Sequence, residues 1–487
     1  MKKRSLVLVA LLIQLSLAIP SPRYKGGCVL VNKNKVYCAG GQSGPTSPTY
    51  QSDLYGLDLS HDYTDLNSLN NAWTTLAPLT EANSEFVMVP SGTNGFFING
   101  GTGSANGKPL QYQSLVYNGA TNTWTNLVAA NATNSLAQAK GAVGTIDSLD
   151  LNDVYIWGGV LDASIGSVNT TYSGTFLVMN PTTGTWSPSL VKGTTPLGWT
   201  PRIGHAMLNS FSTISVFGGQ EARYDTISRT YILSPASMSS IPQFDTILLA
   251  WRLANVTGDI PTPRTYHTVN SAGVFQALLY GGATPGTNTP VTDPLYQARL
   301  SGNSVEWTKL SVTGGPGPRF GHSAVTFGYN TVLVIGGVDT TGAAKSDVNV
   351  YSFSQKQWRT SFATSEFYSY TSNSPNGNSS SNVPPSGSSS SSYSGGSSPF
   401  ALQQGIAGGI GAGGFVFLGL IGLGLYLAVE KKNKQTLVDH PLDPLTHGDG
   451  YTKIEVSPSI DDRPLPPAPA MQTGEAASYL QHHPSNH

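Results

Sequence analysis

The sequence predicts an all-β fold built from six repeated units of about four strands each. Adjacent glycines end an apolar, β-branched run six times, at intervals of roughly 60 residues, and such a spacing is typical of repeat architectures. An aromatic strand and one tryptophan follow each pair in the same order. Gly, Ser, Thr and Asn are abundant and only 11% of residues are charged, which favours short strands joined by turns over helices.

The second glycine of each pair and one tryptophan per unit define the repeat. The second glycines are Gly41, Gly101, Gly159, Gly219, Gly282 and Gly337. The tryptophans are Trp73, Trp124, Trp186, Trp251, Trp307 and Trp358. Glycine lacks a Cβ and reaches positive φ without strain, so we expect each strand to end there close to neighbouring backbone. We expect the aromatic side chains to pack between units as core residues.

Two further features keep the same phase. The strand after each pair is expected to carry Tyr55, Tyr117, Phe176, Tyr231, Tyr296 or Tyr351. Three units also contain a Pro-Arg-x-x-His run, with Arg202 and His205, Arg264 and His267, and Arg319 and His322. Because the three histidines occupy equivalent places, we interpret them as hydrogen-bonded scaffold and not as ligands.

A strand ending in Gly-Gly, then a Tyr-bearing strand and a Trp-bearing strand, resembles the kelch repeat. The resemblance covers roughly residues 22–362. It implies a six-bladed kelch-type β-propeller with four strands in each blade. Both ends of this region supply whole blades, so we expect no exchanged strand to close the ring.

The two ends of the chain predict a type I single-pass membrane protein. We expect it in the plasma membrane, and another membrane of the secretory pathway is the alternative. Residues 1–18 have a basic start, a short apolar stretch and small residues before the end, as a secretory signal peptide does. Residues 405–429 are uncharged and long enough to cross a bilayer, and the lysines that follow place residues 430–487 in the cytoplasm. Residues 363–404 form a Ser/Gly/Pro-rich stalk that we expect to be disordered, as is the tail.

The only two cysteines lie in an expected β-hairpin. Pairing Val31 with Lys35 places Cys28 opposite Cys38, and opposed strand positions have a suitable separation for a disulfide. Two buried free thiols are the alternative.

Catalysis is not expected, and we predict no cofactor or metal. Galactose oxidase resembles these repeats, but its copper-radical site needs a Cys-modified Tyr and two His ligands. Here both cysteines belong to the first blade, and three of the four propeller histidines belong to the repeat. The iron site of plant specifier proteins has its nearest counterpart in Glu221 and Asp225, but Arg229 stands where a ligand would be needed. A membrane-tethered oxidoreductase resembling galactose oxidase is the alternative function.

A recognition or adhesion role outside the cell fits the sequence better. The formal net charge is −1, which argues against nucleic-acid binding. Long polar loops follow the glycine pairs and share one face of the predicted propeller. Candidate contact residues in these loops for an extracellular protein or glycan are Tyr50, Tyr112, Tyr172, Arg223 and Tyr224. A structural surface glycoprotein without a specific ligand is a further alternative.

Four Asn-x-Ser/Thr sequons predict N-glycosylation. They begin at Asn131, Asn169, Asn255 and Asn378. The first three are expected near the face that carries the long loops or at its outer rim, and the fourth lies in the stalk.

The span and the tail each carry one further motif. Gly405, Gly409 and Gly413 recur at four-residue spacing in the span, a pattern that lets two helices approach closely and predicts a homodimer. In the tail, Arg463, Pro466 and Pro469 match the basic-then-PxxP ligand of Src-homology-3 adaptors.

Overall fold

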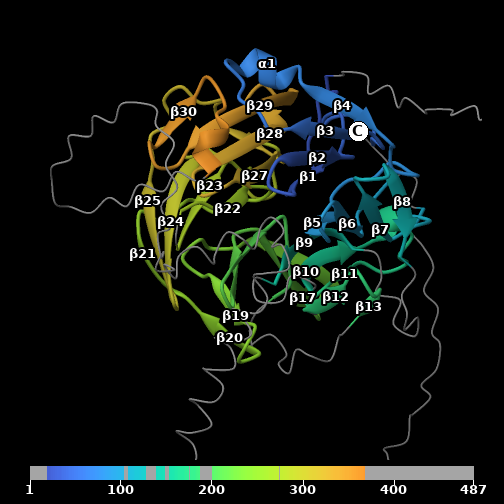
Figure 1. Cartoon of the computed structure of the whole chain (residues 1–487). Helices are drawn as coiled ribbons and strands as arrows, with labels where there is room; N and C mark the ends of the chain where they lie inside the picture. The colour runs from blue at the N-terminus through green and yellow to red at the C-terminus, as the bar shows by residue number, and fades with distance from the viewer. Residues whose placement is uncertain are drawn as a thin grey trace, which may run out of the picture. The chain divides into compact units, whose positions relative to one another are not determined.

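The apolar runs that end at glycine pairs become central strands of six mainly antiparallel sheets around one axis (Figure 1). The computed structural model describes residues 19–103, 108–127, 139–147, 153–174, 176–186, 200–273 and 275–367. Within these residues nearly all regular structure is strand. The exceptions are the α-helix α1 (Leu66–Asn70) and two 3-10 helices, η1 (Ala163–Ile165) and η2 (Thr364–Phe367).

Sheets 1 to 3 are built from consecutive strands. Sheet 1 contains β1 (Gly27–Val31), β2 (Lys35–Ala39), β3 (Leu54–Asp58) and β4 (Trp73–Leu76). Sheet 2 contains β5 (Val87–Ser91), β6 (Gly95–Asn99), β7 (Ser114–Asn118) and β8 (Thr123–Asn126). Sheet 3 contains β9 (Lys140–Ile146), β10 (Val154–Leu161), β11 (Thr171–Tyr172), β12 (Leu177–Asn180) and β13 (Thr185–Trp186).

Sheets 4 to 6 complete the ring, and a smaller sheet stands beside it. Sheet 4 contains β15 (Ala206–Ser210), β16 (Thr213–Phe217), β19 (Pro242–Asp245) and β20 (Ala250–Leu253). Sheet 5 contains β21 (Asn255–Gly258), β22 (Thr268–Ser271), β23 (Gln276–Tyr280), β24 (Leu295–Ser301) and β25 (Ser304–Lys309), with β21 parallel to β25. Sheet 6 contains β26 (Arg319–Phe320), β27 (Ser323–Phe327), β28 (Thr331–Asp339), β29 (Ala344–Ser352) and β30 (Gln357–Arg359). The side sheet contains β14 (Arg202–Ile203), β17 (Gln220–Asp225) and β18 (Thr230–Pro235).

The third strand of sheet 4 differs from the expectation. The sequence predicted that the strand with Tyr231 would follow the glycine pair in the sheet, but Tyr231 lies in β18 of the side sheet. The third strand is β19, whose Phe244 is fully buried and lies opposite Trp251 of β20. The segment between β18 and β20 therefore supplies the third strand of sheet 4.

The six sheets form a closed cycle. The innermost strands are β1, β5, β9, β15, β22 and β27; each contacts the next, and β27 contacts β1. One buried apolar cluster lies between each pair of neighbouring sheets, including sheets 6 and 1. Trp73, for example, is fully buried between sheets 1 and 6, and Trp307 between sheets 4 and 5. The core is thus divided into six interfaces with large aromatic side chains.

The glycine pairs lie where neighbouring sheets touch. Every glycine of the six pairs has positive φ. A Cβ on Gly218 would lie 2.8 Å from the His267 ring of sheet 5, and a Cβ on Gly282 would lie 3.0 Å from the Cβ of the same histidine. His267 is therefore held between the first glycine of the preceding sheet and the second glycine of its own sheet. His205 and His322 have equivalent positions.

The first and last sheets join without exchanging a strand. Arg23, ahead of β1, forms a bridge with Lys345 of β29: its N–H donates to the Lys345 carbonyl at 2.9 Å. Asn70 of α1 adds two hydrogen bonds to the backbone of Val348. The ring is thus closed by backbone and side-chain bonds between two complete sheets.

Cys28 and Cys38 form a disulfide and lie directly opposite each other in β1 and β2. The predicted signal peptide, stalk from residue 368 onward, membrane span and tail lie outside the described residues. In the part of the chain that the structure describes, none of the helices has the length and hydrophobicity needed to span a membrane.

Candidate interaction surface

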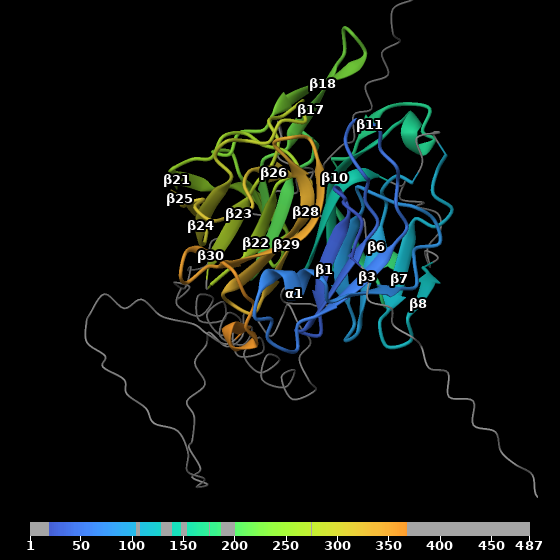
Figure 2. The same cartoon turned by 90° about the horizontal axis from the view of Figure 1, so that it is seen from above.

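A β-hairpin stands out from the ring on the side where strands end at the glycine pairs. It consists of β17 and β18 and begins directly after Gly218 and Gly219. Figure 2 shows β17 and β18 projecting beyond the other labelled strands. The two ends of the hairpin lie side by side at its base, where the Ala236 N–H donates to the Gly219 carbonyl at 3.0 Å.

The hairpin exposes large apolar side chains. Ile227 at the turn is 93% exposed, Ile232 is 55% exposed, and Tyr224 is 49% exposed. Leu233 is also exposed, as are the charged side chains of Arg223 and Arg229. Clustered exposed apolar side chains with a polar rim mark interaction surfaces. We call the set Arg223, Tyr224, Ile227, Arg229, Ile232 and Leu233 the hairpin surface.

Three tyrosines join the hairpin to sheet 3. The Tyr231 ring lies 4.8 Å from the Tyr172 ring and 5.1 Å from the Tyr224 ring, between centroids. Tyr172 belongs to β11, which extends sheet 3 by pairing with β10. Burial raises the pKa of the Tyr172 hydroxyl, with smaller contributions from Asp162 and Tyr231. Tyr172 therefore favours its neutral form in this row.

The turn of the hairpin is held in one conformation. The Asp225 carboxylate accepts hydrogen bonds from the Ser228 hydroxyl at 2.6 Å, the Ser228 N–H at 3.1 Å and the Ile227 N–H at 3.2 Å. These bonds lower the pKa of Asp225 and so favour its ionised form. A fixed turn reduces the entropy that a partner would have to overcome to bind Ile227.

A buried arginine anchors the base of the hairpin. Arg202 is 2% exposed and donates to Glu221 of β17 at 2.7 Å and to the Gly218 carbonyl at 3.2 Å. Burial lowers the pKa of this guanidinium, and the Glu221 charge opposes that shift. The same combination recurs in other sheets, where Arg23 pairs with Asp53, Arg264 with Asp293 and Arg319 with Asp347. The arginines of the Pro-Arg-x-x-His runs are thus scaffold that holds the glycine strands.

Only one of the three histidines of these runs has the expected side-chain hydrogen bond within the described residues. His205, His267 and His322 are all buried, and His322 has Thr268 as a hydrogen-bond partner at 3.0 Å. Neither ring nitrogen of His205 has a hydrogen-bond partner within the described residues. His205 therefore acts mainly by packing against the glycine pairs.

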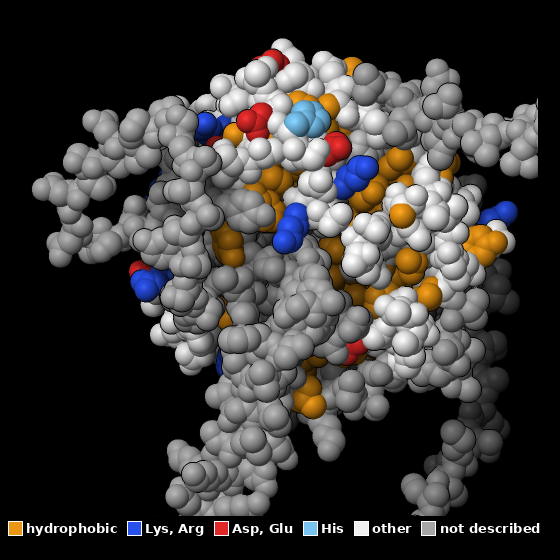
Figure 3. Space-filling model, in the orientation of Figure 1, with side chains coloured by type: hydrophobic (Ala, Val, Ile, Leu, Met, Phe, Trp, Pro, Cys, Tyr) orange, Lys and Arg blue, Asp and Glu red, His pale blue; other side chains and the backbone are white. Residues whose placement is uncertain are grey.

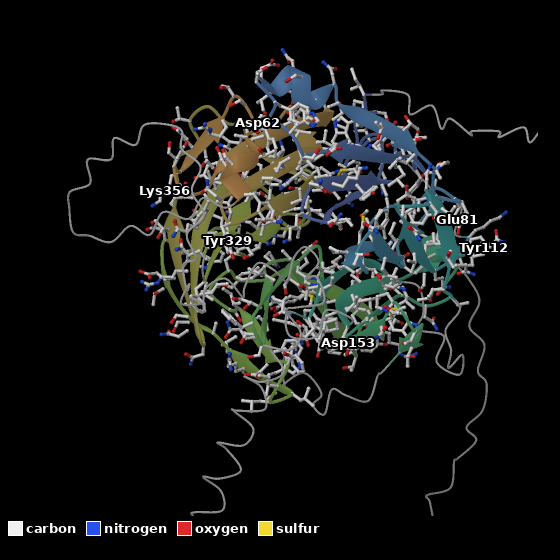
Figure 4. The ribbon with its side chains drawn as sticks, in the orientation of Figure 1. Asp62, Glu81, Tyr112, Asp153, Tyr329 and Lys356 are labelled. Atoms are coloured by element: carbon white, nitrogen blue, oxygen red, sulfur yellow. A yellow bond between two sulfur atoms is a disulfide. The ribbon has the colours of Figure 1, made fainter. Side chains whose placement is uncertain are left out.

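The structure brings together three of the five predicted contact residues. Tyr172, Arg223 and Tyr224 lie in or beside the hairpin, although the last two are in a strand and not in a loop. Tyr50 forms a bridge with Gln42 in sheet 1. Tyr112 packs against the cluster between sheets 1 and 2, and its N–H donates to Glu81 at 3.0 Å (Figure 4).

The sequence did not reveal Tyr231, Ile227, Ile232 and Leu233 as members of this surface. Tyr231 fitted the phase of the repeat, so it was assigned to the wrong sheet. The one available signal was the alternation of apolar and polar residues in Ala222–Asp225 before the Thr226–Arg229 turn, with the apolar run Tyr231–Leu233 after it.

Two of the predicted sequons can be placed. Asn169 is exposed three residues before Tyr172, and Asn255 is exposed in β21 at the outer edge of sheet 5. Asn131 and Asn378 lie outside the described residues, as do Arg463, Pro466 and Pro469 of the tail and the three glycines of the span. Within the described residues no group of three or more His, Cys, Asp or Glu side chains could hold a metal ion. Glu221 is paired with Arg202 instead.

The glycine-ended strands, buried arginines and inter-sheet aromatics agree with a match to a known family. Residues 145–373 match the KLHDC2/KLHL20/DRC7 Kelch-repeats domain. The chain contains a kelch-repeat domain. The matched residues include sheets 4, 5 and 6 and the hairpin, so the hairpin lies within the kelch-repeat region.

Curated relatives share only parts of this chain. Acyl-CoA-binding domain-containing protein 4 of Arabidopsis thaliana is 30% identical over 172 residues, which are 35% of this chain and 23% of that protein. The Rab9 effector protein with kelch motifs of Mus musculus is 32% identical over 135 residues, which are 27% of this chain and 32% of that protein. The chain therefore spans well under two thirds of either relative. The solved structure of YjhT is similar with a TM-score of 0.49 at 17% identity, covering 69% of this chain and 97% of that one.

Proposed function

We propose that this chain is a non-enzymatic, type I membrane glycoprotein whose six-bladed kelch propeller recognises an extracellular protein through the hairpin surface. The exposure of Ile227, Ile232 and Tyr224 on a protruding, anchored hairpin is the observation that carries this proposal. Exposed side chains of this size are costly in water unless a partner covers them.

The chemistry of the hairpin favours a protein partner over a glycan. Tyr and Arg are enriched among residues that dominate binding energies, and Arg223 and Tyr224 are adjacent here. β18 pairs only with β17 among the described strands, so its other edge has backbone groups that a partner strand could pair with. A glycan would offer neither a strand nor a large apolar surface for Ile232 and Leu233.

The two ends of the sequence support the membrane part of the proposal. The signal peptide at 1–18 and the apolar span at 405–429 would place the propeller outside the cell, on the stalk of residues 363–404. The span glycines would support a homodimer. The Arg463-x-x-Pro-x-x-Pro motif would bind a Src-homology-3 adaptor in the cytoplasm.

A crosslinking experiment on living cells tests the recognition surface. The full-length chain would carry a photo-reactive benzoyl-phenylalanine at position 227, and its crosslinked partners would be identified by mass spectrometry. We expect Ile232→Ser to reduce crosslinking about tenfold, because it removes an apolar contact of a few kcal/mol at most. Ile260→Ser is the matched control, since Ile260 is 45% exposed and does not belong to the hairpin.

Two outcomes would contradict the proposal. One is that the probe at position 227 and the same probe at position 260 crosslink the same set of partners. The other is unchanged crosslinking in the Ile232→Ser variant while the protein reaches the surface in normal amounts. Stoichiometric copper or iron in the purified chain would contradict the non-enzymatic assignment and favour the oxidoreductase alternative.

A further inference from the structure

The ring encloses a cavity of about 310 Å³ along its axis, away from the hairpin surface. All six innermost strands contribute side chains to its wall. The volume lies at the lower end of the roughly 300–1,000 Å³ that small-molecule sites occupy. Figure 3 shows hydrophobic side chains beside Lys and Arg side chains near the middle of the face that it views.

The cavity ends before the rim of the ring on the hairpin side. There the Lys25 ammonium forms an ion pair with Glu85 of the neighbouring sheet and lies 4.1 Å from the centre of the Tyr266 ring of sheet 5. Burial opposes the charged ammonium, but the Glu85 carboxylate outweighs it, so the pKa of Lys25 lies above its usual value. These three side chains meet at the axis, and none of them lines the cavity.

The wall of the cavity is mainly apolar. Val89, Ile146, Leu208 and Val269 belong to four different inner strands, and others like them complete the wall. Phe211, which lines the mouth, stacks on Phe275 with 5.0 Å between ring centroids. An apolar wall of this kind selects a ligand with a hydrocarbon part.

One charge distinguishes the mouth. Among the described residues that line the cavity, Lys33 is the only charged one, and it lies in the turn between β1 and β2. Two amide side chains in the wall form hydrogen bonds to the neighbouring inner strand. Asn209 donates to the Ile146 carbonyl at 2.9 Å, and Asn270 donates to the Ala324 carbonyl at 3.0 Å. Lys33 therefore supplies the positive charge that an anionic group at the mouth would need.

We propose that this axial cavity binds an amphipathic carboxylate, with the hydrocarbon chain along the axis and the carboxylate beside Lys33. The site is separate from the hairpin surface and does not depend on the recognition function. The chain's own continuation is a poorer occupant. It leaves the described part at Phe367, which lines the mouth, but residues 368–404 contain no Asp or Glu and cannot pair with Lys33.

Photolabelling of the full-length chain in cell membranes tests the proposal. The probe is a saturated twelve-carbon carboxylic acid with a mid-chain diazirine and a terminal alkyne, and the labelled peptides are mapped by mass spectrometry. We expect labels on β5, β9, β15 or β22, with competition by dodecanoate and at least tenfold weaker competition by dodecanol. Lys33→Glu should reduce labelling at least tenfold. Lys35→Glu should leave it within twofold, because Lys35 is exposed and does not line the cavity.

A second variant keeps the proposal testable if the Lys33→Glu protein does not fold. Ser271→Phe should fill the cavity from β22 and abolish labelling while the surface amount of the protein is unchanged. Equal competition by the alcohol, or undiminished labelling of a folded Lys33→Glu variant, would overturn the proposal. So would labelling that appears only after residues 368–376 are replaced by Gly and Ser, because the chain's own segment would then be the occupant.

Discussion

The N–H of Gly337 donates a hydrogen bond of 2.9 Å to the carbonyl oxygen of Arg23, which joins the last sheet of the ring to the first. Equivalent bonds, from a glycine N–H to a carbonyl oxygen, link Gly41 to Asn83, Gly101 to Ala139, Gly219 to Arg264 and Gly282 to Arg319. One repeated glycine thus serves both as the end of a strand and as the donor to the next sheet.

Replacing Gly337 by Ala should destabilise the protein strongly. The residue has φ of 90°, and a Cβ would lie 2.7 Å from the Cβ of His322. We expect a loss of about 2 kcal/mol or more in the free energy of unfolding beyond that of Gly342→Ala. Gly342 is the matched control, since its φ is 80° but its Cβ would meet nothing within 4 Å. Denaturant unfolding of the two variants measures the difference; equal losses would contradict the role of close packing at Gly337.

Removing a buried arginine should cost more than removing an exposed one. Arg264 is fully buried and donates to Asp293 at 2.8 Å and to the Gly281 carbonyl at 3.1 Å. Arg264→Ala leaves the Asp293 carboxylate without its cationic partner and should cost about 3–5 kcal/mol. Arg299→Ala, which removes an exposed contact to Glu306 at 4.0 Å, should cost less than about 1 kcal/mol. Similar melting temperatures for the two variants would refute the scaffold role of Arg264.

The protein should lose stability in acid because of its buried histidines. Burial, aided by the charge of Arg202, lowers the pKa of His205 to about 3, and burial likewise lowers that of His322 to about 3. In the unfolded chain a histidine is protonated below about pH 6.5. In the folded protein these two histidines stay neutral until about pH 3. The free energy of unfolding therefore falls as the pH falls through this window, by about 2 kcal/mol per histidine at pH 5.

The sheet 2 equivalent of these histidines supplies a test. Phe86 lies against Gly40 and Gly101 as His205 lies against Gly158 and Gly219. His205→Phe should keep stability near that of the original protein at pH 7.5 and lose less of it at pH 5. His61→Phe, at an exposed position, should leave the acid sensitivity unchanged. Thermal melts at the two pH values would measure both effects, and an unaltered pH dependence in His205→Phe would contradict the assignment.

The disulfide should stabilise the terminal sheet. Cys28 and Cys38 are 10 residues apart, and a loop of this size corresponds to about 2–3 kcal/mol in the chain-entropy view. A reductant should lower the melting temperature of the original protein. The Cys28→Ser/Cys38→Ser protein should already melt at the lower temperature and should not respond. An unchanged melting temperature after complete reduction would show that the bond does not staple the sheet.

Local rules predicted the repeated parts of this fold well. The glycine pairs, the Trp73-type positions and the Cys28–Cys38 register depend on steric limits and strand alternation, which are visible in the sequence. The position of Tyr231 was not predictable in this way, because its strand reads the same whether it pairs with β16 or with β17. The approach of Tyr172 to Tyr231 depends in addition on how extensions of two neighbouring sheets meet, which no local pattern encodes.

The hairpin leaves and rejoins the ring at Gly219 and Ala236, and one backbone hydrogen bond closes this neck. Residues 223–234, beyond the Arg202–Glu221 ion pair and the buried Ala222, can therefore diverge, lengthen or be exchanged with little effect on the packing of the six sheets. Selection can change the specificity of this appendage rapidly while the ring itself evolves slowly, and the same neck is a natural place to graft a foreign peptide onto this scaffold.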